Sequence, residues 1–124
     1  MNSNDWITQV RRGILEFCVL TIVNEKPSYG YDLVTTLSSW EQLAAKEGTL
    51  YPLLRRLQKD ELIDSFWQES ESGPPRKYYQ ITEQGKELLT VMESEWGKLT
   101  RAITELKQIK GEDFNGEHGN SLFK

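Results

Sequence analysis

Cationic side chains gather at two places in this chain of 124 residues. The first is residues 48–57, G-T-L-Y-P-L-L-R-R-L, in which two arginines follow a row of leucines. The second is residues 73–79, G-P-P-R-K-Y-Y, in which an arginine and a lysine follow a Gly-Pro-Pro turn. Guanidinium and ammonium groups bind phosphate oxygens, and the arginine fork also matches the edge of guanine. The residues that predict such DNA contacts are Arg55, Arg56, Lys59, Arg76 and Lys77.

The elements that would position these cations are a helix and a β-hairpin. The leucine spacing predicts a helix over residues 47–60, with Pro52 near its first turn, where a missing N–H costs little. Strands are expected over residues 62–68 and 77–81, joined by a long loop. A helix that can enter a groove, beside a cationic hairpin, is typical of a winged helix-turn-helix. The predicted inward face of the helix consists of Leu50, Leu53, Leu54 and Leu57.

Two further helices precede this pair. Residues 6–23 carry an apolar stripe wide enough to require two packing partners. Ser28 is expected to cap a second helix that runs to Trp40. Gly30 lowers the helix propensity there by about 1 kcal/mol relative to alanine, which favours close packing of another backbone at this point.

The last helix is expected to begin after Thr82, a plausible N-cap. Its apolar residues recur at spacings of three and four, a pattern typical of a helix that packs along another helix. The predicted organisation is a winged helix-turn-helix over residues 1–81, a dimerisation helix over 82–110 and a disordered tail over 111–124. The fold class is mainly α with a small β-hairpin. The seam consists of Leu89, Met92, Trp96, Leu99, Ile103 and Leu106.

The overall charge opposes DNA binding. A net charge of −4 and a pI near 5.1 are unusual for a duplex binder, so a favourable field must come from local clustering of cations. An alternative is therefore a winged-helix module that binds proteins and never contacts DNA. A second alternative is a small-molecule carrier built on a dimer pocket. No apolar run is long enough to cross a membrane, and a cytoplasmic location is expected.

Catalytic and metal sites are not expected. The single histidine, His118, lies in the predicted tail and has no second histidine or cysteine pair with which to hold a metal. No partner orients it for nucleophilic catalysis, and no glycine-rich phosphate loop is present. Cys18 lies in an apolar stretch and is expected to be a small buried hydrophobe. We expect neither enzymatic activity nor a cofactor.

The combination of these motifs resembles the PadR family of bacterial transcriptional regulators. The resemblance covers residues 10–106 and rests on G-T-L-Y-P-L-L-R-R-L, G-P-P-R-K-Y-Y and the later I-T-E-Q-G-K-E-L-L. With a single helix after the wing, the chain is similar to the short subfamily that includes regulators of multidrug efflux genes. The resemblance implies a homodimeric repressor of a pseudo-palindromic operator. It also implies that each C-terminal helix packs on the first helix of the partner subunit.

Site residues follow from the resemblance, position by position. Glu61 departs from the pattern, because family members usually have glycine there, and the turn into the wing is expected to differ. Trp96 aligns with a tryptophan that drug-responsive relatives use to hold flat aromatic ligands, although a heptad tryptophan is also often simply packed. Met92 and Leu99 would complete such a ligand site. The implied DNA contacts are Tyr31, Thr49, Tyr51, Arg55, Arg56, Lys59, Arg76 and Lys77. The implied dimer contacts are Val10, Ile14, Phe17, Leu89, Met92, Trp96, Leu99, Ile103 and Leu106.

Overall fold

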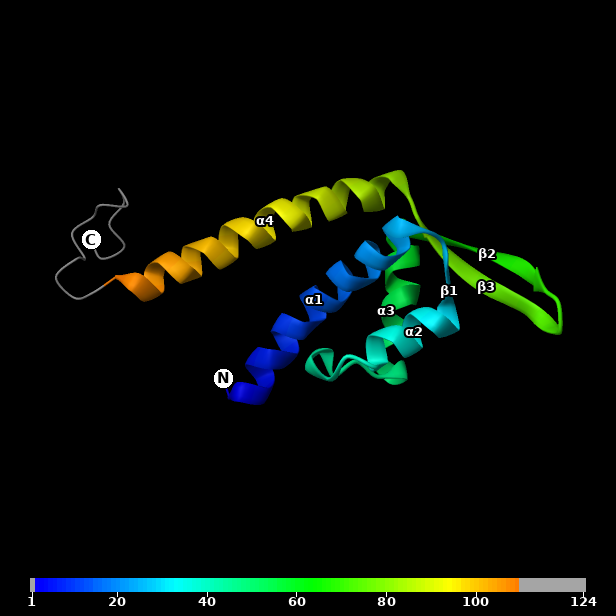
Figure 1. Cartoon of the computed structure of the whole chain (residues 1–124), viewed down its shortest axis with the longest axis horizontal. Helices are drawn as coiled ribbons and strands as arrows, with labels where there is room; N and C mark the ends of the chain where they lie inside the picture. Colours follow the sequence, from blue (N-terminus) through cyan, green and yellow to red (C-terminus); the bar gives the residue numbers. More distant parts are fainter. Residues whose placement is uncertain (1, 110–124) are drawn as a thin grey trace. The chain divides into compact units, whose positions relative to one another are not determined.

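Four α-helices, a short 3-10 helix and three strands make up residues 2–109, the part that this computed structural model describes (Figure 1). The predicted tail and His118 lie outside the described residues. The chain divides into two compact units with a boundary between Thr90 and Val91, inside the last helix. In chain order the elements are α1 (Ser3–Glu25), β1 (Ser28–Tyr29), α2 (Gly30–Ser38), η1 (Glu41–Leu43), α3 (Glu47–Lys59), β2 (Ile63–Ser70), β3 (Gly73–Ile81) and α4 (Glu83–Gln108).

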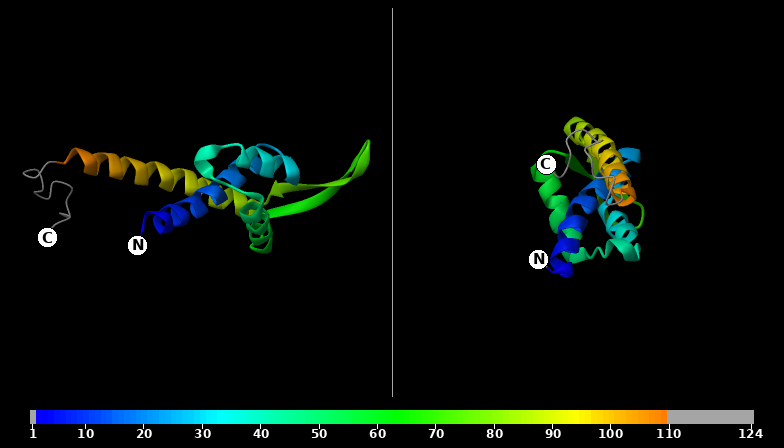
Figure 2. Two further views of the ribbon diagram at one scale, coloured as in Figure 1. Left: turned by 90° about the horizontal axis from the view of Figure 1, so that it is seen from below. Right: turned by 90° about the vertical axis from the view of Figure 1, so that its left-hand side faces the viewer.

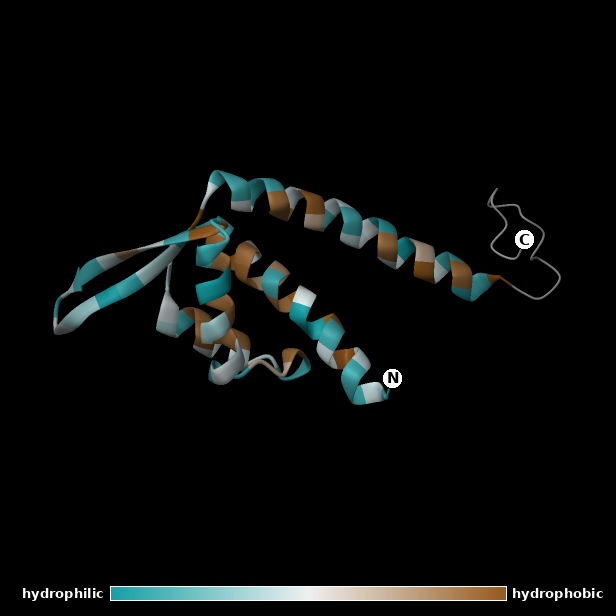
Figure 3. Cartoon of the chain, turned by 180° about the vertical axis from the view of Figure 1, so that it is seen from behind, coloured by the Kyte–Doolittle hydropathy of each residue, from teal (hydrophilic) through white to brown (hydrophobic). Residues whose placement is uncertain are grey.

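The core of the first unit lies where α1, α2 and α3 come together, and Figure 3 shows their hydrophobic residues gathered there. The four leucines predicted to face inward from α3 are all buried. In α1, Val19 and Leu20 have no exposed surface. The leucine spacing therefore predicted the orientation of α3 correctly. When the apolar face of this helix is buried, the opposite, cationic face is turned to solvent.

The sheet has the strand order β1-β3-β2, with both pairings antiparallel (Figures 1 and 2). The predicted hairpin is confirmed, but its strands are longer and its loop is shorter than expected. Residues 73–75 belong to β3, with Gly73 paired with Ser70. The two prolines lie near the tip, where a missing N–H is tolerated. The hairpin of β2 and β3 is the wing.

Strand β1 was not predicted, and it overturns the expected cap at Ser28. Ser28 pairs with Tyr79 and Tyr29 with Tyr78, so both residues are extended. Helix α2 begins at Gly30 without a side-chain cap, and the Ser28 hydroxyl donates to the carbonyl of Lys26 instead, at 3.1 Å. The helix also ends at Ser38, before the expected Trp40. A strand of two residues leaves no periodicity in the sequence from which it could be predicted.

Glu61 ends α3 in the left-handed conformation that glycine would adopt, with φ of 63°. Two hydrogen bonds close the helix, from the Glu61 N–H to the carbonyl of Gln58 at 3.0 Å and from the Leu62 N–H to that of Leu57 at 2.9 Å. This pair defines a Schellman motif. The turn into the wing is thus the one glycine would make, and it does not differ as expected. The glutamate bears the conformational strain.

Replacing Glu61 with glycine is expected to stabilise the protein. The left-handed conformation costs a residue with a Cβ about 1–2 kcal/mol, part of which is offset by the greater freedom of glycine in the unfolded chain. We expect a net gain of about 0.5–1 kcal/mol in the free energy of unfolding, measured by urea titration. Glu61→Ala is the matched control, because it removes the carboxylate and keeps the Cβ. Equal stability of the two variants would contradict the strain.

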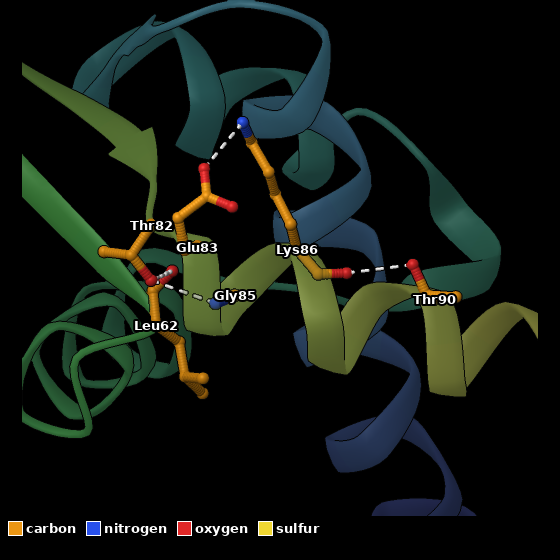
Figure 4. A network of polar contacts seen from close by, with 6 residues as sticks. All are labelled: Leu62, Thr82, Glu83, Gly85, Lys86 and Thr90. Atoms are coloured by element: carbon orange, nitrogen blue, oxygen red, sulfur yellow. Dashed lines mark hydrogen bonds and ion pairs between the residues drawn. The ribbon is translucent and has the colours of Figure 1, made fainter.

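Thr82 caps the start of α4, as the sequence predicted, and also bonds the turn between α3 and the wing (Figure 4). The Thr82 hydroxyl accepts from the Gly85 N–H at 2.9 Å and lies 2.7 Å from the Glu61 carbonyl and 3.1 Å from that of Leu62. Lys86 pairs with Glu83, and the Thr90 hydroxyl donates to the Lys86 carbonyl. Gly85 is buried against Leu62, where no larger residue fits. The first turns of α4 are therefore part of the first unit.

The second unit presents an apolar face of α4. Val91, Trp96, Leu99, Ile103 and Leu106 are between 46% and 60% exposed. Leu89, the first residue of the predicted seam, is only 4% exposed and belongs to the core of the first unit. None of the helices within residues 2–109 has the length and apolar character that a membrane crossing requires.

Cys18 is only partly buried, whereas the sequence predicted a buried residue. Burial nevertheless raises the pKa of its thiol, which therefore stays protonated at neutral pH.

Candidate nucleic-acid interface

A surface cleft of about 270 Å³ lies where the start of α2, helix α3 and the wing meet. It forms because β1 pairs with β3 and so brings the start of α2 against the wing. A Cβ on Gly30 would lie 3.0 Å from the Tyr79 ring and 3.6 Å from the Lys77 carbonyl, so the close neighbour of this glycine is a side chain and not the backbone that the sequence predicted. We call this site the wing cleft. Its lining residues are Tyr29, Gly30, Tyr31, Tyr51, Trp67, Pro75, Arg76, Lys77 and Tyr79.

Aromatic rings hold the two wing cations at the cleft. The Arg76 guanidinium carbon lies 4.7 Å from the centre of the Tyr29 ring, and Lys77 Nζ lies 5.5 Å from the centre of the Tyr79 ring. Such cation–π contacts contribute about 0.5–1 kcal/mol at exposed sites. They restrict the long side chains without neutralising their charge. The cations are therefore positioned to meet an anionic partner.

Two tyrosines of the wing cleft can donate hydrogen bonds to an anion. Tyr31 is 55% exposed at the start of α2. Tyr51 belongs to α3, and its pKa is raised above 10, first by burial and next by the negative charge of Glu47. A raised pKa keeps the Tyr51 hydroxyl protonated over the physiological range, so it remains a donor. A phenolic O–H that faces a cationic cleft suits a phosphate oxygen.

The cations of helix α3 differ in exposure and in whether they form an ion pair. Arg55 and Lys59 are exposed and form no ion pair within residues 2–109. Arg56 is half-buried, and its guanidinium pairs with the Glu16 carboxylate of α1. Arg56 therefore joins α3 to α1, a role the sequence did not suggest, because its partner is 40 residues away. Thr49 and Arg56 line a separate cleft beside α1.

Of the residues predicted to contact DNA, the structure thus gathers four in the wing cleft and places two more on the open face of α3. Trp67 is an additional candidate that sequence reasoning missed. It pairs with Lys77 across the hairpin and is 68% exposed. Because side chains alternate along a strand, Trp67 lies on the same face of β2 as the buried Ile63. Knowledge of the hairpin register would have been enough to place Trp67 beside the wing cations. The register itself was not readable from the sequence.

The predicted ligand site belongs to the second unit. Trp96 is 48% exposed on α4, Met92 is half-buried and Leu99 is exposed. Within residues 2–109, no three histidine, cysteine or acidic side chains lie close enough to hold a metal ion.

Comparison with known proteins places this arrangement in a family. The model of the PadR-like family of transcriptional regulators matches residues 19–91, which include α2, α3, the wing and the start of α4. The chain belongs to the PadR-like family. A relative from Lysinibacillus sphaericus, described as an uncharacterized protein, is 34% identical over 98 residues, which cover 77% of this chain and 90% of the relative.

Solved structures support the same assignment for this PadR-like chain. It is similar to a PadR-like transcriptional regulator from Bacillus cereus with 39% identity and a TM-score of 0.73, over 82% of this chain and 99% of the other. It is also similar to a PadR family regulator from Eggerthella lenta with 33% identity and a TM-score of 0.69, over 86% and 93% of the two chains. The fold is therefore a PadR-like winged helix, and the family is one of transcriptional regulators.

Proposed function

We propose that this PadR-like chain is a homodimeric repressor that binds duplex DNA at a pseudo-palindromic operator. Helix α3 enters the major groove, and the wing contacts the neighbouring backbone or minor groove. The observation that carries the proposal is the pair of exposed cations on α3, Arg55 and Lys59, which form no ion pair within residues 2–109 and lie beside the cation-bearing wing cleft. The family assignment supports the same role.

The roles of the residues follow from their chemistry. Arg55 reads a guanine edge or binds a phosphate, and Lys59 binds phosphate as a point charge. Arg76 and Lys77 bind the backbone next to the wing, while the hydroxyls of Tyr31 and Tyr51 donate to phosphate oxygens. This local set of cations supplies a favourable field despite the net charge of −4, because screening over about 10 Å limits the influence of more distant acids.

Dimerisation through α4 sets the distance between the two α3 helices that contact DNA. The apolar face from Val91 to Leu106 is too exposed for an isolated helix and suits a second copy of the chain. A symmetric dimer would place the two α3 helices about 34 Å apart, one turn of DNA. Protection of two half-sites at that spacing upstream of the protein's own gene tests the proposal. A single protected half-site would contradict it.

Replacing Ile103 with aspartate is expected to convert the dimer into a monomer. Ile103 is 54% exposed in the single chain, so a carboxylate there is harmless to the monomer, and in a dimer it would be buried without a partner. Sedimentation should show a halved mass at micromolar concentration. Arg101→Asp is the matched control, because that residue is exposed on the same helix. A dimer that persists in Ile103→Asp would rule out this face.

Relief of repression by a planar aromatic ligand is the remaining part of the proposal. Such a ligand would lie against Trp96, with Met92 and Leu99 beside it, and would shift the population of dimers able to bind the operator. The measurement is operator affinity in the presence of aromatic compounds that quench Trp96 fluorescence. If every quenching compound leaves the affinity unchanged, ligand relief is excluded.

A further inference from the structure

A second cleft, of about 300 Å³, lies between α1, the end of η1 with the residue after it, and helix α3. It belongs entirely to the first unit and is separate from the wing cleft. Its volume is at the lower end of the range for small-molecule sites. We call it the arginine cleft. Its lining residues are Thr8, Arg11, Arg12, Leu15, Leu43, Ala44, Thr49, Leu53 and Arg56.

Positive charge dominates the arginine cleft. Three arginines line it, from two different helices, and no acidic residue is among the lining residues. The one carboxylate in contact is that of Glu16, which pairs with Arg56. Arg11 and Arg12 therefore form no ion pair within residues 2–109. Three guanidinium groups around one small space repel each other unless an anion lies between them.

Arg11 has a donor that the protein does not use. Its Nε is buried and has no hydrogen-bond partner in the described part of the chain. A buried donor without a partner typically costs about 1–3 kcal/mol. The cost disappears when the guanidinium turns its donor edge toward an acceptor in the cleft. A carboxylate is the acceptor that matches this edge best, since its two oxygens take two parallel N–H donors.

Apart from the arginines, Thr8 and Thr49, the lining is apolar. Leu15 and Leu53 are buried beneath the cleft, Leu43 and Ala44 form one side, and the alkyl parts of the arginines add to this surface. A bare inorganic anion would leave that surface uncovered. We propose that the arginine cleft binds a small organic anion, a carboxylate carried on a short apolar body. Duplex DNA fits less well, because its phosphates carry no apolar body to cover the leucines of the cleft.

Binding in the arginine cleft would act on α3. The incoming carboxylate competes with Glu16 for Arg56 and also meets Thr49, so both polar residues with which α3 lines the cleft respond to it. The link between α1 and α3 would thereby loosen. The expectation that this loosening changes the affinity for DNA rests on the proposed function. Binding of the organic anion in the arginine cleft does not depend on it.

The test is an NMR titration of the arginine Nε–H signals of the intact protein without DNA. Hexanoate is the probe and hexanamide the neutral control of the same shape, both at constant ionic strength. The Arg11 signal is assigned by its loss in Arg11→Lys. We expect hexanoate to shift this signal to saturation in the millimolar range and hexanamide to leave it in place. Arg11→Gln should weaken hexanoate binding at least about tenfold, by loss of a charge-assisted pair.

Arg55→Gln is the matched control variant, because Arg55 is an exposed arginine of α3 that does not line the cleft, and it should bind hexanoate as the native chain does. Three results would overturn the proposal: no saturable shift with hexanoate, equal shifts with hexanamide, or equal shifts with inorganic phosphate. A response of the Arg11 signal to duplex DNA but not to hexanoate would assign the cleft to the DNA interface instead. The wild-type titration stands even if Arg11→Gln does not fold.

Discussion

Replacing Arg55 with alanine is expected to lower operator affinity at least about tenfold and to leave the melting temperature unchanged. Arg55 is exposed and forms no ion pair in the described residues, so its removal costs the fold nothing. A base or phosphate contact contributes about 1–3 kcal/mol, and a homodimer loses it twice. Fluorescence anisotropy with labelled operator measures the affinity, and thermal unfolding measures the stability.

The neighbouring Arg56→Ala provides the informative contrast. It leaves Glu16 without its partner and should lower the melting temperature, an effect that Arg55→Ala does not share. Arg101→Ala, which removes an equally exposed arginine from α4, should change neither quantity. Equal operator affinity in the native protein and Arg55→Ala would remove α3 from the interface.

Replacing Gly85 with alanine is expected to destabilise the protein severely. The added Cβ would lie 2.1 Å from the Leu62 carbonyl oxygen and 2.7 Å from Ile81 Cγ1, so either the start of α4 or the end of the wing must shift. Figure 4 shows how closely α4 approaches Leu62 through the Thr82 contacts, which that shift would break. We expect a loss of about 3 kcal/mol or more in the free energy of unfolding, the range of severe overpacking.

Urea titration of Gly85→Ala against Gln84→Ala checks this expectation. Gln84 is exposed one position earlier in the same helix, so its substitution should change stability by less than about 0.5 kcal/mol. If Gly85→Ala were as stable as Gln84→Ala, the close packing of α4 on Leu62 would be wrong.

Periodic features could be predicted from the sequence. The buried leucines of α3 repeat at helical spacing, Thr82 precedes a long helical pattern, and the alternating wing residues form strands, and all three predictions are confirmed. Each of these features depends on residues close together in the chain. Their spacing alone decides which side chains share a face of a helix or strand, whatever the tertiary structure.

Features that depend on distant contacts were missed or predicted wrongly. Ser28 looked like a helix cap, but pairing with Tyr79 makes it a strand residue. Arg56 looked like a free cation, but Glu16 meets it from α1. The arginine cleft forms only where α1 and α3 come together, so no local pattern in the sequence predicts it. Side-chain charge can be read from a sequence, whereas the pairing of charges requires the fold.

Salt dependence of binding to the upstream region of the protein's own gene tests the central claim most directly. Neutralised phosphates release counterions, so a dimer with several contacts per subunit should lose affinity steeply and linearly in log–log form as salt rises. At each salt concentration it should prefer that duplex over a scrambled one of equal length. Affinity indifferent to salt and to sequence would instead favour a winged-helix module that binds proteins, and would contradict the account.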